Sequence, residues 1–111
     1  SMLIDNAMAA IASLETAPTD AQIDETYEKG AAREIGLGWT GVHYMSVPGA
    51  HVPRINALSD AGKLKLRIYN AVDGADFDKV TFGQTKDGLV TTKAIKLYMD
   101  GALGSRGAAL P

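Results

Sequence analysis

The fold is predicted by one stretch of the sequence, KLYMDGALGSRGAAL, which runs from Lys96 to Leu110. Its first residues alternate as in a β-strand, with aliphatic side chains on one face and Lys96, Tyr98 and Asp100 on the other. A glycine-rich loop follows this strand. In a (β/α) barrel the aliphatic face would meet the outer helices, and the lysine face would point into the barrel. Because an isolated buried ammonium is very costly, Lys96 would there be paired, neutralised or chemically modified.

Two further strands are predicted upstream of this one. Residues 39–45 are rich in aromatic and β-branched side chains, and residues 64–72 alternate between two faces. The strand that carries Lys96 covers residues 90–100. Between the last two strands, residues 76–82 favour at most one helical turn.

Three helical segments are predicted from apolar spacing and end signals. The first covers residues 3–14, which carry a broad apolar stripe at helical spacing. The second begins at a capping-box pattern, Thr19 with Gln22, and ends at Gly36. Its apolar residues recur every fourth position on one face: Ile23, Tyr27, Ala31 and Ile35. The third covers residues 53–62, with a proline in its first turn and a glycine at its end.

Strands that are separated by helical connections pair in parallel through right-handed crossovers. The predicted fold is therefore α/β: a partial (β/α) barrel with three parallel strands and flanking helices, in one domain over residues 1–111. A complete barrel of this kind needs roughly 250 residues, so the 111 residues predict only a segment. We expect Ser1, which precedes Met2, to be the remnant of a cleaved tag.

The composition excludes several classes of protein. The formal net charge of −2 gives no basic footprint, so no nucleic-acid partner is expected. No apolar run reaches the roughly 18 residues of a membrane span, so no membrane partner is expected. Zero cysteines rule out disulfides and thiolate metal ligands and fit a reducing compartment, which predicts a cytoplasmic protein.

Three segments of the chain resemble a known family. The stretch AIKLYMDG from Ala94 to Gly101, with the ALGSRGAAL that follows, resembles the region of the fourth strand in the amidohydrolase superfamily. It is most similar to metal-dependent hydrolases like N-substituted formamide deformylase. LIDNAM at residues 3–8 and LGWTGVH at residues 37–43 resemble earlier segments of these enzymes, in the same order. The resemblance implies that this chain is an internal portion of such an enzyme, with strands two to four of the barrel.

The resemblance also implies a role for Lys96 in the intact enzyme. There this lysine is carboxylated by carbon dioxide, and the carbamate bridges two divalent metals, usually zinc. A carbamate replaces a costly buried cation by a bidentate oxygen ligand. Metal-activated water would then attack the C–N bond of a small-molecule amide or formamide. The alternative is a lysine whose head reaches solvent at the end of its strand.

Three other residues are candidates for contacting substrate or positioning the metal ligands: His43, Asp100 and Arg106. His43 is predicted near the C-terminal end of its strand, which is the catalytic end of such barrels. The alternatives are a hydrogen-bonded, partly buried His43, a turn-capping Asp100 and an ordinary loop arginine. His51 lies beside a proline and is expected to be a solvated residue at a helix start.

The family's remaining metal ligands are missing, because the chain has no His-x-His pair and only two histidines. We therefore expect the chain alone to bind no metal and to be inactive. A second hypothesis is a Schiff-base lyase, in which a desolvated Lys96 attacks a carbonyl and is trapped by borohydride. A third is a non-catalytic module. Three barrel strands leave open sheet edges, which predicts a homo-oligomer that forms through strand edges or helix faces.

Overall fold

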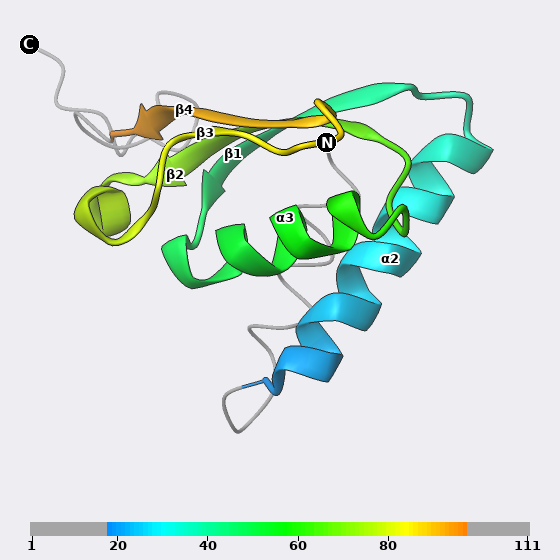
Figure 1. Ribbon diagram of the computed structural model, residues 1–111, viewed down its shortest axis with the longest axis horizontal. Coiled ribbons are helices and arrows are strands. Elements are labelled where there is room, and N and C mark those ends of the chain that lie inside the picture. Colours follow the sequence, from blue (N-terminus) through cyan, green and yellow to red (C-terminus); the bar gives the residue numbers. More distant parts are fainter. Residues whose placement is uncertain (1–17, 98–111) are drawn as a thin grey trace, which may run out of the picture.

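The computed structural model describes residues 18–97, which form a four-stranded sheet with the strand order β1-β2-β4-β3 (Figure 1). The long strands β1 (Gly41–Val47), β2 (Arg67–Asp73) and β4 (Val90–Lys96) pair in parallel. The two-residue strand β3 (Gly83–Gln84) pairs antiparallel with β4. The predicted α/β class and the parallel pairing of three strands are confirmed, whereas β3 is not predicted from the sequence.

Helix α2 (Asp20–Gly36) begins at the predicted capping box. The Thr19 hydroxyl accepts a hydrogen bond from the Gln22 amide at 3.2 Å, and the Gln22 side chain accepts one from the Thr19 amide at 2.8 Å. These bonds satisfy backbone donors that have no preceding helical turn to bind. After the helix, Gly38 adopts a positive φ of 94°, which a glycine tolerates without strain and which turns the chain toward β1.

Helix α3 (Val52–Asp60) follows a short 3-10 turn, η1 (Gly49–His51), and carries a proline in its first turn as predicted. Arg54 on this helix forms a bidentate ion pair with Asp24 on α2, in which its Nε donates to Oδ1 at 2.9 Å. A planar guanidinium matches the two oxygens of a carboxylate, so the pair fixes the relative orientation of the two helices.

The connection from β2 to β4 is held by the end of α3. It contains the predicted helical turn as a 3-10 helix, η2 (Gly74–Lys79). In the turn between β3 and β4, the Asp87 carboxylate accepts from the Ser59 hydroxyl at 2.6 Å, and the Asp87 amide donates to the Asp60 carboxylate at 3.1 Å. These contacts explain why a strand as short as β3 is ordered against β4.

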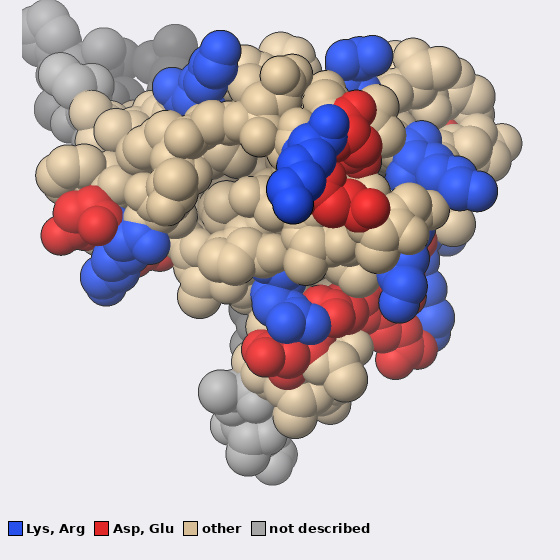
Figure 2. All heavy atoms as spheres, in the orientation of Figure 1, with Lys and Arg blue, Asp and Glu red and all other residues tan. Residues whose placement is uncertain are grey.

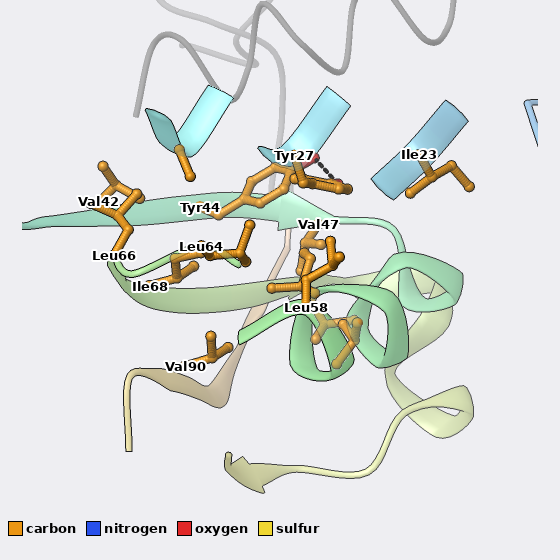
Figure 3. Packing of buried hydrophobic residues seen from close by; sticks show 14 residues of the cluster. Ile23, Tyr27, Val42, Tyr44, Val47, Leu58, Leu64, Leu66, Ile68 and Val90 are labelled. Carbon is orange, nitrogen blue, oxygen red and sulfur yellow. Dashed lines mark hydrogen bonds between the residues drawn. The ribbon is translucent and has the colours of Figure 1, made fainter. Parts of the chain in front are cut away.

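The hydrophobic core lies between the sheet and the two helices, which cover the same face of the sheet (Figure 1). Figure 3 shows side chains from α2, β1 and β2 meeting in this layer. The labelled members are Ile23, Tyr27, Val42, Tyr44, Val47, Leu58, Leu64, Leu66, Ile68 and Val90. Burial of this apolar set is what stabilises a parallel sheet that has too few strands to close on itself.

The opposite face of the sheet is covered by no described helix, and we call it the helix-free face. It carries His43 and Met45 from β1, and Tyr69 and Ala71 from β2, which pair across the two strands. Met45 is 48% exposed. Parallel sheets normally have both faces covered, so this face has the character of a surface on which further structure packs.

The predicted apolar face of α2 is right for three residues and wrong for the fourth. Ile23, Tyr27 and Ala31 are buried, whereas Ile35 is 41% exposed and Glu34 is only 3% exposed. A helix turns by about 100° per residue, so a spacing of four drifts by about 40° at each step. After three steps Ile35 has left the core side, and Glu34 has returned to it.

Two predicted elements lie outside the described residues: the helix over 3–14, and the part of the last strand beyond residue 97 with its glycine-rich loop. Within residues 18–97, no helix combines the length and the apolar character that a membrane span requires. Figure 2 shows Lys and Arg side chains beside Asp and Glu over the part of the molecule formed by α2 and α3. The outer surface of the helical layer is therefore a solvated surface of mixed charge.

Candidate functional site

Lys96, the predicted metal ligand, is the last residue of β4 and lies at the C-terminal edge of the parallel strands. In the strand register Lys96 is opposite Asp73, and Ile95 is opposite the buried Val72. Paired residues project to the same face of a sheet, so Lys96 shares the helix-free face with Asp73. The register agrees with the predicted alternation of Ile95 and Lys96, but Ile95 is 43% exposed, so the described helices do not bury it as predicted.

A β-bulge at Lys93 produces this orientation. Thr92 pairs with Asn70 and faces the core, whereas Ala94 pairs with Ala71 on the helix-free face. Lys93 therefore has no partner in β2, and the alternation of β4 shifts by one residue at this point. Without the bulge, Lys96 would share the core face with Thr92, where its ammonium would be costly to bury.

Asp73 is the acidic neighbour of Lys96 across the sheet. Its side chain accepts a hydrogen bond from the amide of Ala75 at 3.1 Å, which begins η2 and fixes the carboxylate at the strand end. From the sequence alone Asp73 is only part of a turn. Asp73 lies opposite Lys96 because of the pairing register of β2 and β4, and a single sequence does not reveal that register.

The loops at this edge pack tightly against the strand ends. The Gly49 amide donates to the Asp76 carboxylate at 2.9 Å, which joins the loop after β1 to η2. Gly74 lies so close to β4 that a Cβ at this position would be 2.8 Å from the carbonyl oxygen of Lys96. The main chain around Lys96 is thus held by close contacts from the connection that follows β2.

His43 lies on the same face as Lys96 but away from this edge. The predicted position near the C-terminal end of a strand is wrong, because β1 runs from Gly41 to Val47 and His43 is its third residue. The side chain is exposed and stacks on Tyr69, with ring centroids 5.5 Å apart. The alternative of a hydrogen-bonded, partly buried histidine does not hold either. Its proposed role in contacting substrate stays a prediction.

His51 is buried, contrary to the expectation of a solvated residue. Its Nδ1 lies 2.8 Å from the Tyr27 hydroxyl, which lies 3.1 Å from the hydroxyl of Tyr44 (Figure 3 draws the two tyrosines). Burial lowers the pKa of the imidazole and raises that of the Tyr27 hydroxyl. The prediction failed because His51 packs against Tyr27 of α2, a tertiary contact that the local Pro-Gly pattern does not encode.

The described residues do not complete a metal site. Among residues 18–97, no three His, Cys, Asp or Glu side chains are grouped closely enough to hold a metal ion. Lys96 and Asp73 are adjacent, but neither histidine joins them, since His43 is nearer the other end of the strands and His51 lies in the core. Asp100 and Arg106, the other predicted site residues, lie outside the described residues.

Two solved structures share this fold. An uncharacterized metal-dependent hydrolase from Pyrococcus horikoshii OT3 matches with a TM-score of 0.71 and 25% identity, and one from Pyrococcus furiosus matches with 0.69 and 24%. Each match covers 83% of this chain but only 20% of the hydrolase. No protein-family model and no curated protein matches the sequence. The chain is therefore structurally related to a small part of metal-dependent hydrolases.

Proposed function

We propose that this chain is a segment of an amidohydrolase barrel and that it supplies Lys96 as a carbamate ligand of a divalent metal, zinc by family resemblance. The observation that carries the proposal is the place of Lys96: the C-terminal end of a parallel strand, on the helix-free face, opposite Asp73. Active sites of (β/α) barrels lie at this end of the strands. The fold match to a metal-dependent hydrolase supports the coarser part of this proposal, a segment of a metal-dependent hydrolase.

The substrate class follows from the sequence resemblance. It favours a small molecule with an amide or formamide C–N bond, as in the branch that includes N-substituted formamide deformylase. In this proposal the chain contributes one metal ligand and part of the wall of the site, while the other ligands come from parts of a barrel that residues 18–97 do not contain. Turnover belongs to the intact barrel, and the chain by itself is inactive.

The test uses metal content, because it reads out the proposed role of Lys96 directly. The matching segment of the P. horikoshii hydrolase is replaced by residues 18–110 of this chain, and zinc, iron, nickel and manganese are measured per chain after purification without chelator. We expect the hybrid to retain metal, Lys96→Ala to lose most of it, and Lys93→Ala to keep it. Lys93 is the matched control, since it is exposed and lies in the same strand.

Circular dichroism establishes that each hybrid is folded before its metal is measured. A folded hybrid that keeps stoichiometric metal with Lys96→Ala would contradict the proposed ligand role. The chain alone gives an independent check: in the presence of zinc and bicarbonate we expect far less than one metal per chain. Stoichiometric metal there would mean that one chain, or several copies together, assembles a complete site.

The open sheet favours self-association as a second, non-catalytic property. β1 is an edge strand of the described sheet, and its seven residues offer backbone donors and acceptors along that edge. Exposed edges of this length pair readily with other strands. We propose that copies of the chain associate through strand edges or helix faces when no further barrel strands are present.

A further inference from the structure

We propose that the chain by itself, with no further barrel strands packed on the helix-free face, has a second ligand site, a pocket for a small aromatic carboxylate at the N-terminal ends of β1 and β2. It lies on the helix-free face and has a volume of about 470 Å³. Its lining includes Trp39, Gly41, His43, Arg67 and Tyr69. Arg67 begins β2, whereas Lys96 ends β4, so the pocket lies toward the opposite end of the parallel strands.

The pocket has the size and the wall of a small-molecule site. Ligand pockets usually measure about 300–1,000 Å³ and are lined by aromatic and apolar side chains with a few polar groups. Here the His43 ring stacks on Tyr69 with an interplanar angle of 29°, which fixes a flat aromatic wall. Trp39 is 60% exposed at the rim, so its indole is free to lie against a bound ring.

The charge of the pocket selects an anion. No acidic residue lines it, and Arg67 forms no ion pair with any residue of the described part of the chain. A guanidinium donates two parallel hydrogen bonds to a carboxylate, which gives both affinity and orientation. Gly41 leaves room for the Arg67 side chain, since a Cβ on Gly41 would lie 3.3 Å from the Arg67 Cβ.

The aromatic wall and the single guanidinium together define the ligand class. A ring between Trp39 and the His43–Tyr69 stack would place a short carboxylate arm at Arg67. One arginine offers too little positive charge to hold a nucleic-acid backbone, which needs several phosphate contacts. A neutral aromatic compound would leave the guanidinium without a partner, so the carboxylate should be preferred.

The chain contains one tryptophan, so its fluorescence reports on this pocket alone. The probe is 3-phenylpropanoate, which is transparent at 295 nm, and the matched neutral compound is 3-phenylpropanamide. We expect a saturable change in Trp39 emission with the acid and at least about tenfold weaker binding of the amide, the value of one charge-assisted contact. Equal binding of both compounds, or no saturable change with the acid, would overturn the proposal.

Variants locate the contact. Arg67→Gln should weaken binding of the acid about tenfold and leave that of the amide unchanged, and Arg67→Lys should give an intermediate loss. Arg33→Gln is the control, since Arg33 is exposed on α2 and lies outside the pocket. If Arg67→Gln and Arg33→Gln behave alike, the carboxylate is not bound by Arg67 and the proposal fails.

Two further measurements distinguish this pocket from the metal role proposed for Lys96 and from an interface between two copies of the chain. Lys96→Ala should leave binding of 3-phenylpropanoate unchanged, so that failure of the proposed metal role and failure of this pocket are distinguishable. If a second copy covers the pocket instead, Trp39 emission should shift to shorter wavelength with rising protein concentration and should not respond to the acid. That result would assign the pocket region to an interface and overturn the ligand proposal.

Discussion

The buried His51 predicts that the folded chain loses stability on mild acidification. Burial holds the imidazole pKa below its ordinary value of 6.5, so the unfolded chain binds a proton that the folded chain excludes. Stability rises with pH wherever the unfolded state binds more protons. The contribution of the neutral His51 to the free energy of unfolding is therefore complete above about pH 6.5. It is lost as the pH falls through the pKa of His51 in the folded chain.

The size of this effect has an upper limit. One proton gives a slope of at most about 1.4 kcal/mol per pH unit, so the loss between pH 7.5 and 5.5 is at most about 1.4 kcal/mol. Small domains are stable by only about 5–15 kcal/mol, so such a loss is measurable. The carboxyls of Asp24 and Asp87 have pKa values lowered further below their ordinary value of about 4, so they do not titrate between pH 5.5 and 7.5.

The assay is urea unfolding followed by circular dichroism at several pH values. The two histidines of the chain provide a matched pair, since His43 is exposed and His51 is buried. We expect His43→Asn to keep the pH dependence and His51→Asn to remove it. Tyr27→Phe deletes two buried hydrogen bonds and should cost about 1–3 kcal/mol at pH 7.5. An unchanged slope in His51→Asn would refute the reasoning.

Three other predictions test the fold. Gly74→Ala should destabilise the chain by about 1–3 kcal/mol, because the new Cβ would lie 2.6 Å from Leu97 Cδ2. Gly30→Ala, at an open position in a helix, should instead stabilise the chain by up to about 1 kcal/mol. Equal midpoints of the two variants in thermal unfolding would contradict this prediction. Thr19→Ala should cost about 1 kcal/mol through loss of the capping box, with Thr40→Ala as an exposed control in the same melting experiment. The chain should self-associate, so light scattering should give a mass that grows with concentration; a constant monomer mass would count against open-edge pairing.

The sequence predicted those elements that depend on local chemistry. The capping box of Thr19 and Gln22 is confirmed because both of its bonds form within one turn. Three parallel strands were predictable from the alternation of helical and extended segments, although β1 runs over Gly41–Val47 rather than residues 39–45. β3 was not predictable, since a two-residue strand depends on its pairing with β4 and on contacts of the following turn with α3.

The histidines show why the candidate site was harder to predict. The eight-residue spacing of the two histidines does not reveal that His51 is buried against Tyr27 while His43 is exposed on the helix-free face. Burial of a polar side chain depends on partners that are distant in the sequence, here 24 residues away. Local patterns therefore located the strands but not the surroundings of the side chains they carry.

The register places Lys96 on the helix-free face, although strict alternation along its strand would predict the other one. Val90 and Thr92 are buried, so uninterrupted alternation would direct Lys96 toward the helices as well. The bulge at Lys93 reverses the alternation and directs Lys96 to the face that it shares with Asp73. A hydrophobic core needs the first half of this strand to face the helices, and the metal-ligand role proposed for Lys96 needs the second half to face away. One extra residue meets both requirements, which is a physical reason for a bulge beside the proposed site.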